Sequence, residues 1–240
     1  MNLKFTISYD GSSFYGSQKQ PNKPTVEAEL LKTFRAFNIN TKIILSGRTD
    51  KGVHATGQVF NCQIPFLWDN VEKFKELLNK RLHQGIRILK IEEAHEDFHS
   101  RFSAKKRVYR YLITQKELTS FNSKFLLQHK NIDEEAIKQA IKEFVGVYDF
   151  KYFFKTGSEK ENTIREVFNA KFYKYKGLYI FRFEANSYLR SQIRLMVGFL
   201  LAISDKKLTI EDLRDQLKST KQSFTTPIPS NGLYLAKVKY

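Results

Sequence analysis

The two halves of the chain show strand and helix patterns in the same order, and this constrains the fold more than any other feature. Each half reads as strand, helix, strand, strand, helix, strand. Strands are predicted where apolar and polar residues alternate, and helices where apolar residues recur every three or four positions. In the first half this predicts strands over residues 3–9, 43–45, 59–64 and 86–92, a helix capped by Thr25, and a helix with an Asp69–Glu72 capping box.

The second half repeats this order with one additional helix. Its predicted elements are strands over residues 107–114, 164–173, 178–185 and 232–240 and helices capped by Asp133, Ser187 and Thr209, with Gly146 ending the first of these helices. The order predicts an α+β fold made of two ferredoxin-like units, the split βαβ type that RNA-recognition domains use. The halves share no residue-level repeat. We expect subdomains at 1–104 and 105–240.

The charge of the chain indicates a polyanionic partner. Lys and Arg outnumber Asp and Glu by 41 to 25, a formal net charge of +16. Nucleic acid is the first expectation and a membrane surface the second. The second is weaker, because no helix combines a basic face with a clean apolar face as a membrane-surface helix does. The 21 Phe and 12 Tyr are mostly expected in the core. A few of them could stack on unpaired bases beside cations.

Other bulk properties favour a cytoplasmic globular protein. The 240 residues are enough for a substantial core. No apolar run approaches the ~20 residues of a membrane span, and the N-terminal pattern reads as a strand rather than a signal peptide. Cys62 is the only cysteine, so no disulfide can form within the chain. We find no phosphate-binding glycine loop and no convincing metal cluster, which fits a chain that uses no cofactor and no metal.

A short polar stretch, Gly47 to Ala55, lies between two of the expected strands. It reads Gly-Arg-Thr-Asp-Lys-Gly-Val-His-Ala. Glycines near both ends suit a tight loop with unusual backbone angles. Strand-bounded loops often carry catalytic groups, although on pattern alone a polar surface turn is the more common explanation.

This stretch resembles the active-site motif of the tRNA pseudouridine synthase A family, Gly-Arg-Thr-Asp-x-Gly-Val-His-Ala. Further stretches resemble the same family in the same order along almost the whole chain. They are Tyr9-Asp10-Gly11-Ser12 with Tyr15-Gly16, Asp97 to Ala104, Arg107-Val108-Tyr109-Arg110-Tyr111, Ala185-Asn186-Ser187-Tyr188 with Arg194 and Val197-Gly198, and Gly232-Leu233-Tyr234-Leu235.

The resemblance implies two α/β subdomains whose antiparallel sheets join, a basic cleft between them, and a homodimer. It implies isomerisation of uridine to pseudouridine in tRNA, at positions 38 to 40 of the anticodon stem–loop. The reaction moves the glycosidic bond from N1 to C5 of the same base, without a redox step or an external group. It therefore requires no cofactor.

Asp50 is the catalytic carboxylate that the resemblance implies. An aspartate is ionised at neutral pH, so it needs positioning and a nearby cation rather than activation. Arg194 is the candidate cation. It follows Arg190 by one helical turn, so we expect the two to share a helix face that points away from the core.

The resemblance also assigns substrate-binding roles to Tyr109 and Arg48. The ring of Tyr109 would stack on the target uracil and its hydroxyl could take part in proton transfer, although Tyr111 lies on the same strand face and pattern alone does not separate them. Arg48 could fill the gap left by the extruded base or hold a flanking phosphate. His54 is interpreted as a hydrogen-bonding residue that fixes the loop. Candidate phosphate contacts are Arg101, Lys105-Lys106-Arg107 and the lysines between 171 and 176.

Two alternatives remain open on the sequence. His95-Glu96-Asp97-Phe98-His99 matches the H-E-x-x-H pattern of zinc proteases, but that chemistry needs a helix, and this segment has no helical pattern. A non-catalytic RNA-binding module would explain the charge and fold but would leave Asp50 without a role.

Three positions depart from the family. Ser17 stands where tryptophan is usual, Gly85 where an aspartate is common and Lys51 where a small residue is frequent. These departures concern tRNA contacts and fine specificity rather than Asp50, Tyr109 or Arg194.

Overall fold

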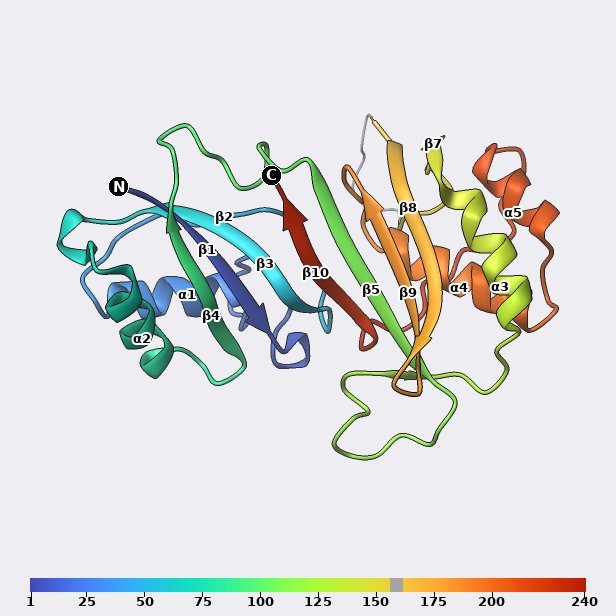
Figure 1. Ribbon diagram of the computed structural model, residues 1–240, viewed down its shortest axis with the longest axis horizontal. Coiled ribbons are helices and arrows are strands. Elements are labelled where there is room, and N and C mark those ends of the chain that lie inside the picture. The colour runs from blue at the N-terminus through green and yellow to red at the C-terminus, as the bar shows by residue number, and fades with distance from the viewer. Residues whose placement is uncertain (156–161) are drawn as a thin grey trace. The chain divides into compact units, whose positions relative to one another are not determined.

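The computed structural model describes residues 1–155 and 162–240. The chain divides into two compact units, one formed by residues 1–105 together with 234–240 and the other by residues 106–233. The fold is α+β, with strands and helices in both units (Figure 1). The last strand was predicted in the second subdomain. In the structure residues 234–240 belong to the first unit instead, because Tyr234 and Leu235 pair with His54 and Ala55.

The first unit is an antiparallel sheet with two long helices. Its elements are β1 (Asn2–Tyr9), the 3-10 helix η1 (Gly11–Ser13), α1 (Val26–Arg35), β2 (Ile44–Leu45), β3 (His54–Gln63), the 3-10 helix η2 (Phe66–Trp68), α2 (Val71–Arg81), β4 (Ile86–Glu93) and β10 (Leu233–Lys239). β1 lies between β4 and β3 and is antiparallel to both, and β2 is antiparallel to β3. The order β4-β1-β3-β2 is that of a split βαβ unit. β10 adds a parallel pairing at the start of β3.

Aromatic side chains form the core of the first unit. Phe5 of β1 and Phe60 of β3 are directly opposite in register, and their rings stack at 4.5 Å. Phe34 of α1 packs edge-on against Phe5 at 5.8 Å and contacts Phe74 of α2 at 6.4 Å. These four side chains are fully or almost fully buried. The two helices therefore pack against the same face of the sheet.

The second unit has a four-stranded antiparallel sheet in the order β5-β9-β8-β7. Its elements are β5 (Lys106–Thr114), β6 (Leu127–Gln128), α3 (Glu134–Ala140), the 3-10 helix η3 (Ile141–Phe144), β7 (Gly146–Asp149), β8 (Ile164–Tyr175), β9 (Leu178–Ala185), α4 (Gln192–Ser204) and α5 (Ile210–Leu217). β6 pairs parallel to β5. Lys176 and Gly177 form the predicted tight turn between β8 and β9, both with positive φ (48° and 79°).

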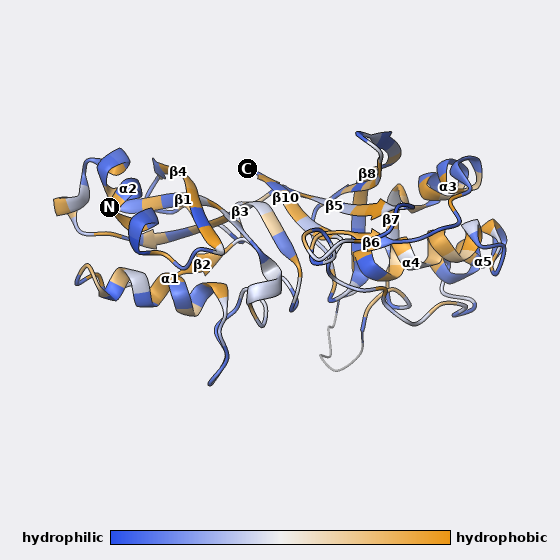
Figure 2. Cartoon of the chain, turned by 90° about the horizontal axis from the view of Figure 1, so that it is seen from below, coloured by the Kyte–Doolittle hydropathy of each residue, from blue (hydrophilic) through white to orange (hydrophobic). Residues whose placement is uncertain are grey.

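The core of the second unit connects the sheet to α4, which is largely apolar (Figure 2). Phe183 of β9 contacts Phe144 at 6.1 Å, Phe144 contacts Phe153 at 5.5 Å, and Phe153 reaches Phe199 of α4 at 6.1 Å. In Figure 1, α4 runs behind β8 and β9. The side chains of Phe183 and its neighbours on that face are thus covered.

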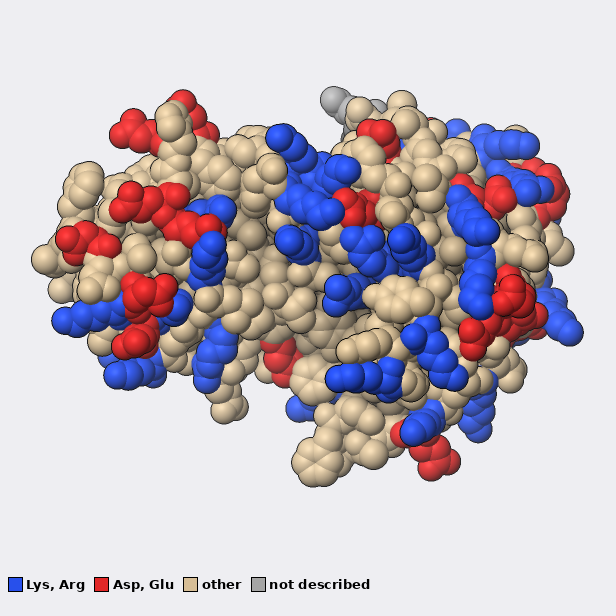
Figure 3. Space-filling model, viewed as in Figure 1, with Lys and Arg blue, Asp and Glu red and all other residues tan. Residues whose placement is uncertain are grey.

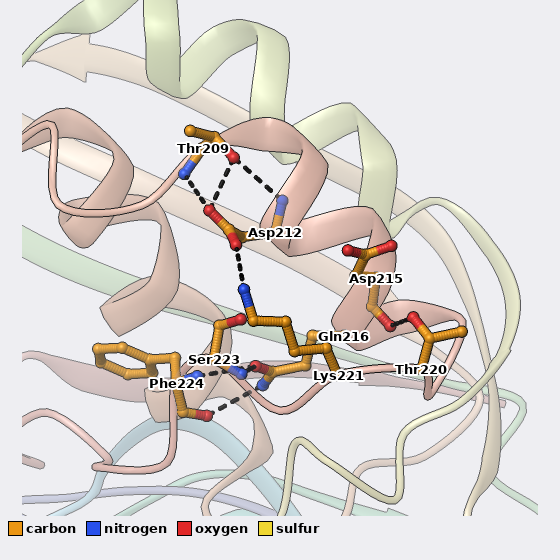
Figure 4. A network of polar contacts seen from close by, with 8 residues as sticks. All are labelled: Thr209, Asp212, Asp215, Gln216, Thr220, Lys221, Ser223 and Phe224. Carbon is orange, nitrogen blue, oxygen red and sulfur yellow. Dashed lines mark hydrogen bonds and ion pairs between the residues drawn. The ribbon is translucent and has the colours of Figure 1, made fainter.

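The first residues of the helices confirm three of the five predicted N-caps. Thr25, Asp133 and Thr209 cap α1, α3 and α5, and Thr209 forms the predicted capping box with Asp212 (Figure 4). The prediction at Asp69 was wrong by one residue, because Asn70 accepts the hydrogen bond from Lys73 N. The prediction at Ser187 was also wrong. α4 begins after Ser191, whose left-handed backbone (φ 59°) interrupts the chain and whose side chain makes no capping bond.

Candidate functional site

The loop between β2 and β3 is fastened from one side by the segment that follows β1. Ser17 is fully buried, and its Oγ accepts a hydrogen bond from Thr49 N at 2.9 Å. Ser17 N donates in return to Thr49 O at 3.1 Å. The hydroxyl of Tyr9 lies 2.9 Å from Thr49 Oγ1, and burial raises the pKa of Tyr9 to about 12. Thr49, the residue before Asp50, is therefore held through both its backbone and its side chain.

The sequence predicts that Ser17 affects tRNA contacts and fine specificity. The structure shows it buried under the loop, supporting the backbone beside Asp50. Its place directly after the motif residues Tyr15 and Gly16 is the available signal, but only the fold reveals what it contacts.

The other side of the loop is fastened by strand β3. Gln58, fully buried, donates to Gly47 O at 2.9 Å and accepts from the Ser46 hydroxyl at 2.6 Å. Val53 N donates to Asp50 O at 3.1 Å, which closes a turn with Gly52 at φ 80°. The turn leaves Arg48 exposed and Asp50 half-buried.

Gly11 and His54 lock the end of the loop. A Cβ at Gly11 would lie 2.0 Å from Val53 O, so only glycine allows this approach. Gly11 N donates to Nδ1 of buried His54 at 3.0 Å, as expected of a loop-fixing histidine. Asp10 Oδ1 also lies 3.3 Å from this Nδ1.

His54 also stacks on Tyr234 of β10, with ring centroids 4.8 Å apart. Burial, and then the negative charge of Asp10, raise the pKa of the Tyr234 hydroxyl well above its usual range. His54 is the first residue of β3. It therefore joins the loop to the parallel β3–β10 pairing.

Tyr109 and Arg194, the other predicted site residues, lie in the second unit. Tyr109 is on β5, 8% exposed, and its ring meets that of Tyr188 edge-on at 5.2 Å. Tyr111 is fully buried and its hydroxyl donates to Pro229 O at 2.6 Å. Since Tyr111 is buried and its hydroxyl is bonded to a backbone carbonyl, Tyr109 is the better candidate for contact with a base.

Arg194 is a half-buried residue of α4, and its Nε donates to Ile228 O at 2.6 Å. The expected helix face shared with Arg190 was wrong, because Arg190 precedes the helix and its carbonyl accepts from Lys155 N. The segment that leads to Ile228 is held by α5 at residues 223 and 224. The side chain of Gln216 accepts from Ser223 N and Phe224 N, both at 2.8 Å, and donates to Phe224 O at 3.0 Å (Figure 4).

The segment with the H-E-x-x-H pattern is a turn rather than a helix. Asn2 Nδ2 donates to the carbonyls of His95 and Phe98, both at 3.0 Å, so the backbone wraps around this side chain. The imidazole of His99 instead stacks on Phe102 at 4.3 Å. Within residues 1–155 and 162–240 no group of three metal-ligating side chains comes together. In the same ranges no helix is long and apolar enough to cross a membrane.

Comparison with known proteins places the chain in a family. The family profile described as tRNA pseudouridine synthase matches residues 6–103 and 140–240. The chain therefore belongs to the tRNA pseudouridine synthase family. Two similar relatives are named tRNA pseudouridine synthase A. The protein of Wolinella succinogenes is 39% identical over 98% of this chain and 92% of its own length. That of Helicobacter hepaticus is 40% identical over 99% of this chain and 98% of its own.

A solved structure, a Cbf5-Nop10-Gar1 complex, matches with a TM-score of 0.37 and 16% identity, covering 83% of this chain and 45% of that one. This likeness is too low to add to the assignment.

Proposed function

We propose that this protein isomerises uridine to pseudouridine at positions 38 to 40 of the tRNA anticodon stem–loop, with Asp50 as the catalytic carboxylate. The observation that carries the proposal is the loop containing Asp50. Ser17, Gln58 and His54 hold its backbone by buried hydrogen bonds, while Asp50 remains half-buried and Arg48 exposed. A rigidly supported carboxylate at partial exposure suits a residue that must meet the sugar–base junction of an extruded nucleotide.

The reaction balances without a second substrate. The N1–C1′ bond breaks, the detached uracil turns, and C5 forms a new bond to C1′. C5 then loses its proton and N1 is protonated. No electron is exchanged with another molecule, so the protein needs to supply only the carboxylate, the binding of the freed base and proton transfer.

We assign substrate-binding roles to Tyr109, Arg194 and Arg48. The ring of Tyr109 would stack on the uracil and retain it after bond cleavage. Arg194 would supply a cation that stabilises the anionic form of the catalytic carboxylate. Arg48, exposed on the loop, would contact the RNA where the base has left the stack. We also propose that the protein is a cytoplasmic homodimer.

Replacement of Asp50 tests the proposal. Asp50→Asn keeps the side-chain size and removes the charge, and Asp69→Asn is the matched control at an exposed aspartate. With tRNA transcripts, we expect the control to form pseudouridine at the wild-type rate. Asp50→Asn should bind tRNA and form none. Pseudouridine formation by Asp50→Asn would reject Asp50 as the catalytic group. A wild-type protein that binds tRNA but never modifies it would favour the alternative of a non-catalytic RNA-binding module.

A further inference from the structure

Three basic side chains stand side by side across the sheet of the second unit. Arg110 of β5 is opposite Arg182 of β9, and Arg182 is opposite Lys171 of β8. Neighbouring strands lie about 4.8 Å apart, so this basic row spans roughly 10 Å. Arg110 and Lys171 are exposed and Arg182 is partly exposed. Figure 3 shows Lys and Arg side chains gathered over β5, β9 and β8 on the face toward the viewer.

The basic row lies on the opposite face of the sheet from Tyr109. Successive side chains of a strand point to opposite faces, so Tyr109 and Arg110 diverge. Tyr109 pairs with Phe183, which packs on the covered side against Phe144. The row therefore occupies the face that α4 does not cover. A nucleotide held against the ring of Tyr109 would not reach it.

Folding alone does not favour this arrangement. Like charges directly opposite one another in a sheet repel and lower stability. Glu184 relieves part of the repulsion, since its carboxylate lies 2.7 Å from Arg182 and 3.8 Å from Lys106. Within the part of the chain that the structure describes, neither Arg110 nor Lys171 has a carboxylate partner. An external anion would offset the remaining charge.

We propose that the basic row is a second binding surface for the phosphate backbone of tRNA, used by a part of the RNA outside the anticodon stem–loop. The proposal rests on the proposed function. Arg and Lys at strand spacing match a chain of phosphates, which position RNA without reading its sequence. The row lacks the apolar area that a protein partner would cover, because its members are long cationic side chains around one carboxylate.

The test compares the double variant Arg110→Gln/Lys171→Gln with the control Lys142→Gln/Lys218→Gln, which removes two exposed charges from the same unit. Binding of full-length tRNA and of the isolated anticodon stem–loop is measured against salt concentration. Each lost phosphate contact lowers the salt slope by about 0.7 to 0.9. Between 50 and 200 mM salt, the affinity of wild type for full-length tRNA should thus fall about 7 to 12 times more than that of the double variant.

The affinity for the isolated stem–loop should be the same for wild type, the double variant and the control. The rate of pseudouridine formation at saturating tRNA should also be the same for all three proteins. The melting temperature of the double variant should be unchanged or higher, because repulsion has been removed. If the double variant melts at a lower temperature than wild type, the single variant Lys171→Gln is used in its place, and the expected change in the salt slope is half as large. An unchanged slope with full-length tRNA would overturn the proposal. So would an equal loss for the stem–loop, which would place the row in the primary site.

Failure of this inference is distinguishable from failure of the proposed function. In the first case wild type modifies tRNA and the double variant binds it like wild type. In the second, wild type forms no pseudouridine.

Discussion

Ser17→Ala isolates the support beneath Asp50. The substitution removes the Oγ that accepts the Thr49 N–H at 2.9 Å but keeps the bond from Ser17 N to Thr49 O. Thr49 is only 7% exposed, so water does not readily replace the lost acceptor. A buried N–H left without a partner costs about 1–3 kcal/mol. For a protein of this size each kcal/mol corresponds to about 2–4 °C, so the melting temperature should fall by roughly 2–12 °C.

The same change should lower kcat more than it raises KM. Ser17 is fully buried and cannot touch bound RNA in this structure, whereas Asp50 follows directly on Thr49. A displacement of about 1 Å at a catalytic group can cost on the order of 100-fold. With one of two backbone bonds retained, we expect kcat to fall by about 10- to 100-fold. The assay is single-turnover and steady-state pseudouridine formation beside thermal melting, with exposed Ser13→Ala as the control. This reasoning would be refuted if Ser17→Ala had the melting temperature and kcat of wild type, or if only its KM changed.

Three further predictions follow from buried groups. Tyr188→Phe should raise the melting temperature by a few degrees, because the hydroxyl is buried without a hydrogen-bond partner among the described residues; a lower value would show that the hydroxyl is satisfied in solution. Gly11→Ala should lower both stability and activity, because its Cβ would meet the backbone oxygen of Val53 at 2.0 Å. Gly85→Ala should be milder, because its Cβ would meet only side-chain atoms among its nearest neighbours, His83 Nδ1 at 3.1 Å and Phe14 Cε2 at 3.4 Å. Burial raises the pKa of the Cys62 thiol to about 12, while in the unfolded chain it ionises near ~8.5. The contribution of this thiol to the free energy of unfolding is therefore intact below pH ~8.5 and declines by about 1.4 kcal/mol per pH unit toward pH 12. Between pH 8 and pH 10, urea unfolding should show the free energy of unfolding of wild type falling by about 2 kcal/mol more than that of Cys62→Ala. Equal losses in the two proteins would contradict the burial argument.

Local patterns predicted the helices and the hairpin well, because their signals lie within a few residues. Thr209 and Asp212 are three positions apart and form the capping box that this spacing predicts. The start of α4 was misplaced because Ser187 and Ser191 are equally plausible caps by residue type. Only the left-handed backbone at Ser191 decides between them.

Features that depend on distant residues were beyond the sequence. Nothing near residue 234 indicates that it pairs with His54, 180 positions earlier. The same holds for Ser17, whose partner Thr49 lies 32 residues away. The motif identified the loop and Asp50 as candidates, but the means by which the loop is held required the fold.

The parallel pairing of β10 with β3 has a consequence for how the protein is made. His54 rests on the ring of Tyr234, and residues 234–240 belong to the first unit although the whole second unit precedes them in the chain. During synthesis the start of β3 stays without its β10 partner until residues 234–240 have been translated, after the whole second unit. The histidine that closes the loop beside Asp50 thus acquires its aromatic support late, so in a nascent chain this loop would be completed only after residues 106–233 have been translated.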